Sequence, residues 1–179
     1  MHGIKNRVAG VVWLCLLTHM GWAQARPDCS VRLGPAVVDF GRTTRGQLLA
    51  QSPPGDPLSF GLRRAQANVQ CEQPGPLRLT LVAPAAYAGQ YRFGAGTLSV
   101  RVLTVRVDGK TVDWISDGQA PAADARTLQP GVSLIPAVAG MGIEGRSLEV
   151  ELELEAHVTS AATRVSDLTR FETRLSFRQ

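Results

Sequence analysis

The sequence predicts an all-β sandwich, and three observations carry that prediction. Leucine, valine and alanine alternate strictly with glutamate and histidine over residues 148–158. Glutamate and leucine favour helices, but in a helix these apolar residues would spread over every side, whereas in a strand they form one face. Asp108-Gly109 separates two β-prone segments, as in a two-residue hairpin. Glycine and proline turn signals recur throughout the chain, so many short strands are expected.

The strand-like segments follow one another with short breaks, and no segment shows a convincing helical period. Residues 51–57, 83–96 and 118–124 are rich in proline, glycine or alanine and are expected to be loops. Pro136 predicts an edge or bulge position within its strand, because proline cannot donate a ladder hydrogen bond. The expected strands cover residues 30–33, 35–41, 58–62, 68–71, 77–81, 98–107, 110–115, 132–138, 148–158 and 171–177.

Residues 1–25 have the pattern of a secretory signal peptide. Lys5 and Arg7 precede an apolar run over residues 8–22, and Ala23-Gln24-Ala25 supplies small residues at the positions an export protease reads. Cleavage is expected after Ala25, with Ala23 as the alternative. The run is too short for a membrane span, and bulky residues before Cys15 disfavour lipid attachment there. Residues 26–179 are then expected to form a single exported domain.

The charge of the exported chain is nearly balanced. Without Lys5 and Arg7, 17 cations face 15 acids, which gives a net charge of +2, and Lys110 is the only lysine. The cations form no runs. The footprint of a nucleic-acid-binding protein is therefore lacking, and no nucleic-acid partner is expected.

Two cysteines, Cys29 and Cys71, remain after export. In an oxidising compartment such a pair predicts one disulfide. A metal site is the competing interpretation, but His157 is the only histidine left in the exported chain. The disulfide is therefore preferred.

No residue set predicts catalysis or a bound cofactor. Residues 140–145 have the glycine spacing of a dinucleotide-binding loop, but a strand follows them instead of the helix that such a loop needs. His157 has no flanking serine or cysteine motif. The four glutamates between residues 149 and 155 are expected to form a solvated strand face, since successive side chains on one face lie nearly 7 Å apart. A non-enzymatic protein without metal or cofactor is expected.

Residues 113–117 offer an alternative function. Asp113, Trp114 and Asp117 place an aromatic ring beside two acids near a hairpin, and sugar sites often use such groups. Tyr87 and Tyr91 lie nearby in the sequence. The same aromatics could equally pack into the core or rim of a sandwich.

Residues 170–179 form an amphipathic strand pattern. Phe171, Thr173, Leu175 and Phe177 point one way in an extended chain, and the residues between them point the other way. Such a strand either lies inside a sheet or leaves an edge that another chain must pair.

The sequence resembles the fimbrial subunits that Gram-negative bacteria assemble by the chaperone–usher pathway. The resemblance rests on the order of several loose motifs that together span nearly all of the exported chain. These are Cys29-Ser-Val, residues 37–41 (Val-Val-Asp-Phe-Gly), Cys71 after a strand, residues 127–136 (Thr-Leu-Gln-Pro-Gly-Val-Ser-Leu-Ile-Pro) and the amphipathic pattern of residues 171–177.

The resemblance implies an incomplete immunoglobulin-like β-sandwich that lacks its last strand. A periplasmic chaperone, and then a neighbouring fimbrial subunit delivered by the outer-membrane usher, would supply that strand. Phe171, Thr173, Leu175 and Phe177 would line the receiving groove, and the carboxylate of Gln179 would meet basic chaperone residues. The protein would pass through the periplasm to a fimbrium on the cell surface.

Two departures from the family pattern modify this expectation. Only residues 26–28 precede Cys29 after cleavage, which is too short for a donor strand and indicates a minor or tip subunit with a role in adhesion. The terminal aromatic, Phe177, is third from the end, where the family usually has tyrosine next to last. The alternative is a self-contained secreted or periplasmic sandwich that binds a ligand such as a glycan or a host protein receptor.

Overall fold

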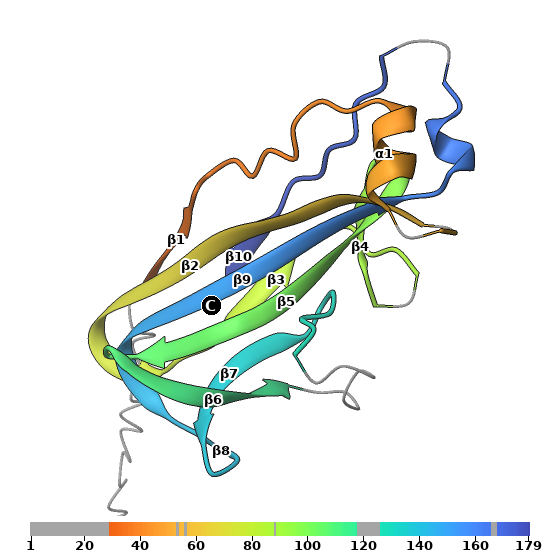
Figure 1. Cartoon of the computed structure of the whole chain (residues 1–179). Coiled ribbons are helices and arrows are strands. Elements are labelled where there is room, and N and C mark those ends of the chain that lie inside the picture. The colour runs from red at the N-terminus through yellow and green to blue at the C-terminus, as the bar shows by residue number, and fades with distance from the viewer. Residues whose placement is uncertain (1–28, 53, 56, 88, 118–125, 166–167) are drawn as a thin grey trace, which may run out of the picture.

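The computed structural model describes residues 29–179 except 53, 56, 88, 118–125 and 166–167 (Figure 1). The expected signal peptide, residues 1–25, lies outside the described residues. The elements in chain order are β1 (Cys29–Gly34), α1 (Arg45–Gln51), β2 (Leu58–Pro76), β3 (Leu79–Val82), β4 (Tyr91–Phe93), β5 (Gly96–Val107), β6 (Lys110–Asp117), β7 (Ser133–Val138), β8 (Met141–Gly142), β9 (Glu144–Val158), the 3-10 turn Ala161–Thr163 and β10 (Ser176–Arg178).

The strands form two antiparallel layers around one core, which confirms the predicted all-β sandwich. The first layer runs β1-β2-β9-β5, with β4 added beside β5. The second runs β7-β3-β10, with β8 added beside β7. Strand β6 joins the layers, because residues 110–112 pair with β5 and residues 113–117 pair with β7. The strands therefore follow one continuous path whose two ends are β1 and β10.

Strand β9 is the centre of the first layer. Its register with β2 runs from Pro76↔Glu144 to Leu58↔Val158, and its other edge pairs with β5. Its apolar residues are almost fully buried, whereas the alternating polar residues lie on the outer face. The predicted strand is confirmed. The buried set is Leu148, Val150, Leu152, Leu154, Ala156 and Val158.

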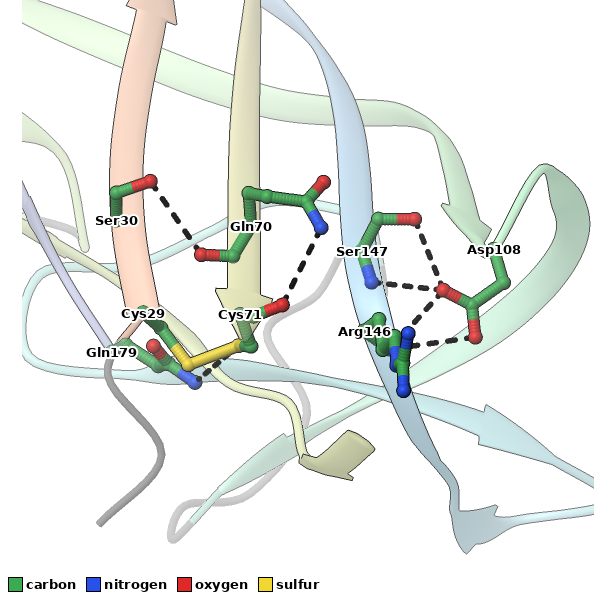
Figure 2. The surroundings of a disulfide bond; sticks show 8 residues. All are labelled: Cys29, Ser30, Gln70, Cys71, Asp108, Arg146, Ser147 and Gln179. Atoms are coloured by element: carbon green, nitrogen blue, oxygen red, sulfur yellow. Dashed lines mark hydrogen bonds between the residues drawn. A yellow bond between two sulfur atoms is a disulfide. The ribbon is translucent and has the colours of Figure 1, made fainter. Parts of the chain in front are cut away.

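The predicted hairpin turn is also confirmed, and it has a second role. Asp108 and Gly109 both have positive φ values, as the tight turn between β5 and β6 requires. Figure 2 shows that the Asp108 carboxylate also accepts hydrogen bonds from Arg146 and Ser147, near the start of β9. Its Oδ1 lies 2.8 Å from the Ser147 backbone nitrogen, 3.0 Å from Ser147 Oγ and 3.1 Å from the Arg146 backbone nitrogen. The turn therefore fastens the hairpin to the central strand.

The predicted disulfide is confirmed. Cys29 and Cys71 are direct partners in the β1–β2 ladder, with their Cα atoms 4.0 Å apart. Because it closes a sequence separation of 42 residues, the chain-entropy estimate of its stabilisation is about 4 kcal/mol. The Gln179 side chain donates a hydrogen bond from Nε2 to Cys71 Sγ at 3.4 Å (Figure 2). The disulfide thus lies where the first and last described residues meet.

Several local predictions were wrong. Residues 45–51 form α1, which the sequence analysis did not expect; its start is a capping box in which Thr44 and Gln47 bond to each other's backbone nitrogens. Residues 35–41 do not form a strand. The two short strands expected at residues 58–62 and 68–71 are parts of the single strand β2, and β4 lies inside the expected loop 83–96.

Pro136 occupies a gap in the pairing of β7. On one side, Leu134 is the last residue of β7 that pairs with β3, and Ala137 is the first that pairs with β8. Pro136 lies between them, so its missing N–H interrupts no ladder on that side. Pro136 therefore lies at a short unpaired stretch on one side of β7, although β7 itself lies in the interior of the sheet.

Tyr91 is the largest of the fully buried side chains. Its hydroxyl has no hydrogen-bond partner among the described residues, and burial raises the pKa of Tyr91 far above its usual range. An unpaired buried hydroxyl costs free energy, on the order of 1–3 kcal/mol.

We predict that Tyr91→Phe leaves the protein as stable as wild type or stabilises it by up to about 1 kcal/mol, because the substitution removes the unpaired hydroxyl and keeps the ring. Urea unfolding of the two proteins measures the difference. Tyr91→Leu is the matched control and is expected to destabilise the core, because it leaves a cavity. A clear loss of stability in Tyr91→Phe would mean that the hydroxyl has a partner.

We predict that Asp108→Asn lowers stability at neutral pH and that the difference from wild type shrinks in acid. The hydrogen bonds that its carboxylate accepts from Ser147 and Arg146 lower the pKa of Asp108 below the ordinary value of an aspartate. The contribution of the ionised carboxylate is therefore present above the unfolded-state pKa and is lost as the pH falls through the folded-state pKa. Asparagine tolerates the left-handed backbone at this position, so it serves as a matched substitution. Urea unfolding at pH 7 and below pH 4 tests this, and a difference independent of pH would contradict it.

Candidate functional site

The two ends of the strand path define the candidate site. Strand β1 pairs with β2 alone, and β10 pairs with β3 alone, within the described sheet. Each end continues into a segment without strand pairing, residues 35–44 after β1 and residues 168–175 before β10. In Figure 1 the orange segment after β1 and the dark blue segment before β10 run along the same edge of the molecule. We call the boundary between residues 29–44 and residues 168–178 the seam.

Four phenylalanine rings connect the two sides of the seam. Phe40 comes from the first side and Phe171 from the second, and both contact Phe93 of β4. The ring centroids lie 5.6 Å apart for Phe40 and Phe93 and 6.4 Å apart for Phe93 and Phe171. Phe60 of β2 packs 6.0 Å from Phe93 and 5.6 Å from Phe171. Phe93 therefore contacts one ring from each side of the seam, and Phe60 supports Phe93 and Phe171.

The apolar side chains on both sides of the seam are only partly buried. They pack against the core but keep part of their surface in solvent, unlike the residues of β9. Val37 is 78% exposed and Leu168 is 82% exposed, one on each side. The partly buried set is Val31, Leu33, Val38 and Phe40 on the first side, and Phe171, Leu175 and Phe177 on the second.

Side chains and isolated backbone contacts hold the two segments in place. Arg63 donates from Nε to the Asp39 carbonyl at 2.9 Å and from Nη2 to the Phe40 carbonyl at 3.1 Å, and its guanidinium lies 5.5 Å from the Phe40 ring centroid. On the other side, the Gly94 backbone nitrogen donates to the Glu172 carbonyl at 3.1 Å. These contacts hold the segments without forming a strand ladder between them.

The predicted groove residues all lie on the second side of the seam. Phe171, Thr173, Leu175 and Phe177 are partly buried, and the residues between them are exposed, as the alternation predicts. Only residues 176–178 pair as a strand, however, so the expected strand 171–177 is mostly extended chain without a ladder. Gln179 lies at the disulfide and contacts Cys71 through its side-chain amide.

The first side of the seam and its aromatic base are not predicted by the sequence. Phe40 belongs to a predicted strand motif, and no local pattern points to Phe60 or Phe93. Phe93 lies in a stretch rich in alanine and glycine, a composition that predicts a loop. The alternation of Val31 and Leu33 with polar residues was the one available signal for this side.

The residues considered for glycan binding are not brought together as one group. Trp114 packs against the core and lies on the face of β6 opposite Asp113 and Asp117, because successive strand residues alternate. Asp117 forms an ion pair with Arg78 at 2.8 Å. Tyr87 is exposed in the segment between β3 and β4, whereas Tyr91 is fully buried.

The outer face of the first layer carries mixed charges in register. Glu153 lies opposite Arg64 on one side and Arg101 on the other, and Glu149 lies opposite Arg106. Arg64 also forms a 3.5 Å ion pair with Glu151. A depression on this face is lined by Arg64, Arg106, Glu149 and Glu151, so its lining carries no net charge.

His157 belongs to a small polar cluster at the end of β9. Glu155 Oε1 lies 3.2 Å from His157 Nε2 and accepts a hydrogen bond from Ser59 Oγ at 3.0 Å. The carboxylate lies between serine and histidine, so this cluster lacks the serine–histidine contact of nucleophilic catalysis. Across the described residues, no group of three or more potential metal ligands occurs. In that same part of the chain, no helix is long and apolar enough to cross a membrane.

No protein-family model matches the chain, and no curated protein matches it in sequence. The function is therefore inferred from the geometry of the seam.

We predict that backbone amides of residues 168–175 exchange with deuterium much faster than those of residues 148–158, because the first lack ladder hydrogen bonds and the second are paired on both edges. Hydrogen-exchange mass spectrometry of the native protein measures both segments in one experiment. Equal protection would mean that the seam is already closed by backbone pairing.

Proposed function

We propose that this chain is an exported fimbrial-type subunit whose sandwich is completed by a strand from another protein. The observation that carries the proposal is the seam, where two strand edges with partly exposed apolar side chains face the same boundary. A strand inserted there would satisfy backbone groups on both sides and cover the apolar residues, which is the mode of recognition known as strand addition.

The free energy of such strand addition would come mainly from burial of the apolar surface of the seam. Full burial of a large apolar side chain contributes about 1.5–3 kcal/mol relative to exposure. Phe40, Phe171, Leu175 and Phe177 are each buried only in part, and Val37 and Leu168 are largely exposed. Covering even a portion of this surface would add several kcal/mol, which is comparable to the whole stability of a small domain.

The resemblance to chaperone–usher subunits supplies the class of partner. A periplasmic chaperone would occupy the seam first, and a neighbouring subunit would replace it at the outer-membrane usher. The Cys29–Cys71 disulfide fits an oxidising compartment such as the periplasm. The proposed location of the finished protein is a fimbrium on the cell surface, where it contributes to adhesion.

We predict that a synthetic strand rescues the isolated chain. The probe is a peptide of about ten residues that alternates valine or isoleucine with threonine or serine, the length of an ordinary strand. The exported chain, unfolded in urea with its disulfide intact, is diluted with and without the peptide. Soluble folded monomer is expected to form in low yield without peptide and in severalfold higher yield with it, and the amides of residues 168–175 are expected to become protected.

A scrambled peptide of the same composition is the matched control, because it keeps the hydrophobicity and loses the alternation. It is expected to give no rescue. A chain that refolds alone into a monomer of high thermal stability, and that gains no protection from the alternating peptide, would instead be a self-contained secreted sandwich.

A further inference from the structure

Positive charge is concentrated on the two sides of the seam. Within the described structure, the seam (residues 29–44 and 168–178) carries five arginines against two acids, Asp39 and Glu172. The other described residues carry 11 cations and nine acids. The seam therefore has a net charge of +3, against +2 for the much larger remainder of the described structure. Its arginines are Arg32, Arg42, Arg170, Arg174 and Arg178. Four of them, all except Arg42, lie next to apolar residues of the seam.

These arginines alternate with the apolar residues of the seam. Arg170, Arg174 and Arg178 are exposed, and the partly buried Phe171, Leu175 and Phe177 follow or precede them in the same extended segment. On the first side, Arg32 is exposed between the partly buried Val31 and Leu33. Because strand residues alternate between faces, the arginines line the outer face of the seam and the apolar residues its inner face.

The two acids on these segments offset little of this charge. Asp39 accepts a hydrogen bond from the Gly41 backbone nitrogen through Oδ1 at 2.7 Å, within its own turn. Glu172 lies 3.9 Å from Arg170, and both of these side chains are more than 70% exposed. Arg174 and Arg178, which are not part of this ion pair, are also exposed on the outer face.

We propose that the seam selects a strand in which apolar residues alternate with aspartate or glutamate. The apolar side chains would enter the core between Phe40 and Phe171, and the acidic side chains would lie outward beside Arg170, Arg174 and Arg178. Directly opposite residues on neighbouring strands have their Cβ atoms about 5 Å apart, close enough for opposite charges to attract and for a lysine to be repelled. This inference rests on the proposed strand-accepting function and names the chemistry of the donor.

Arginines on the outer face of the first layer differ from those of the seam in having acidic residues beside them. Arg64, Arg101 and Arg106 each lie opposite a glutamate of β9 or form an ion pair with one. Those arginines have acidic neighbours within the sheet. Arg178 has no acidic strand opposite it on the open side of β10, where the described sheet ends, and Arg170 and Arg174 lie in the segment before β10, outside any strand.

Three peptides that differ only in their outward residues test the inference. Each keeps the same alternating valine and isoleucine positions, and the intervening residues are all glutamate, all threonine or all lysine. The peptide concentration that gives half of the maximal soluble yield on refolding is measured for each. The glutamate peptide is expected to act at about a tenfold lower concentration than the threonine peptide, because each exposed pair contributes roughly a factor of two to three. The lysine peptide is expected to be the weakest.

Salt provides an independent readout of the same interaction. The screening length falls from about 10 Å at 0.1 M to about 3 Å at 1 M. The advantage of the glutamate peptide is therefore expected to disappear at about 1 M salt, while the threonine peptide keeps its effect.

Two triple variants separate local pairing from overall charge. Arg170→Ser, Arg174→Ser and Arg178→Ser together are expected to remove the glutamate advantage. The matched control combines Arg64→Ser, Arg101→Ser and Arg106→Ser, which changes the net charge equally and is expected to preserve it. Equal loss in both variants, or equal action of the glutamate and threonine peptides, would overturn the acidic-donor inference and leave strand acceptance intact. Failure of all three peptides would overturn both.

Discussion

The structure depends on the strict alternation of residues along β9. Its apolar residues fill the core while its glutamates face outward between arginines of β2 and β5. A slip of one residue against either neighbour would bury the glutamates and expose the leucines, so the register of the first layer is strongly specified. Because β2 is fixed in this way, β1 is fixed beside it, and Cys29 falls opposite Cys71.

The path of strands has two ends, β1 and β10, and these two strands are paired differently from the strands between them. On this path each strand from β2 to β3 has a neighbour on both sides, whereas β1 and β10, at the ends of the path, each keep one open edge in the described sheet. Open edges favour association with any exposed strand. The arginines beside β10 place like charges where two copies of this edge would meet, so they disfavour self-pairing while leaving the edge open to an acidic strand.

Sequence reasoning succeeded where the pattern is local and repeated. The alternation of residues 148–158, the Asp108-Gly109 turn and the cysteine pair each specify a structure through neighbouring residues, and each prediction was confirmed. Helix α1 was missed although Thr44 and Gln47 carry a capping signal, because the helix is short and has one buried residue, Leu48.

The candidate site was predicted on one side only. Residues 171–177 show the expected alternation, but their position beside residues 35–44 follows from how the two layers close, and no local pattern encodes that closure. Phe93 lies beneath both sides because β4 pairs with the start of β5. The position of Phe93 depends on contacts between residues distant in the sequence, and these contacts outweigh the low strand propensity of the surrounding alanines and glycines.

The late position of β9 in the chain has a consequence for folding. A 179-residue chain made from its N-terminus completes β2 and β5 long before β9, which begins at Glu144 and separates them in the sheet. Until then the apolar faces of both strands lack their shared neighbour, and pairing of such distant segments is slow. The nascent protein therefore passes through a long interval with two open sheet edges and uncovered leucines, the state in which chains aggregate most readily. A factor that holds the chain during this interval would protect it before the seam exists.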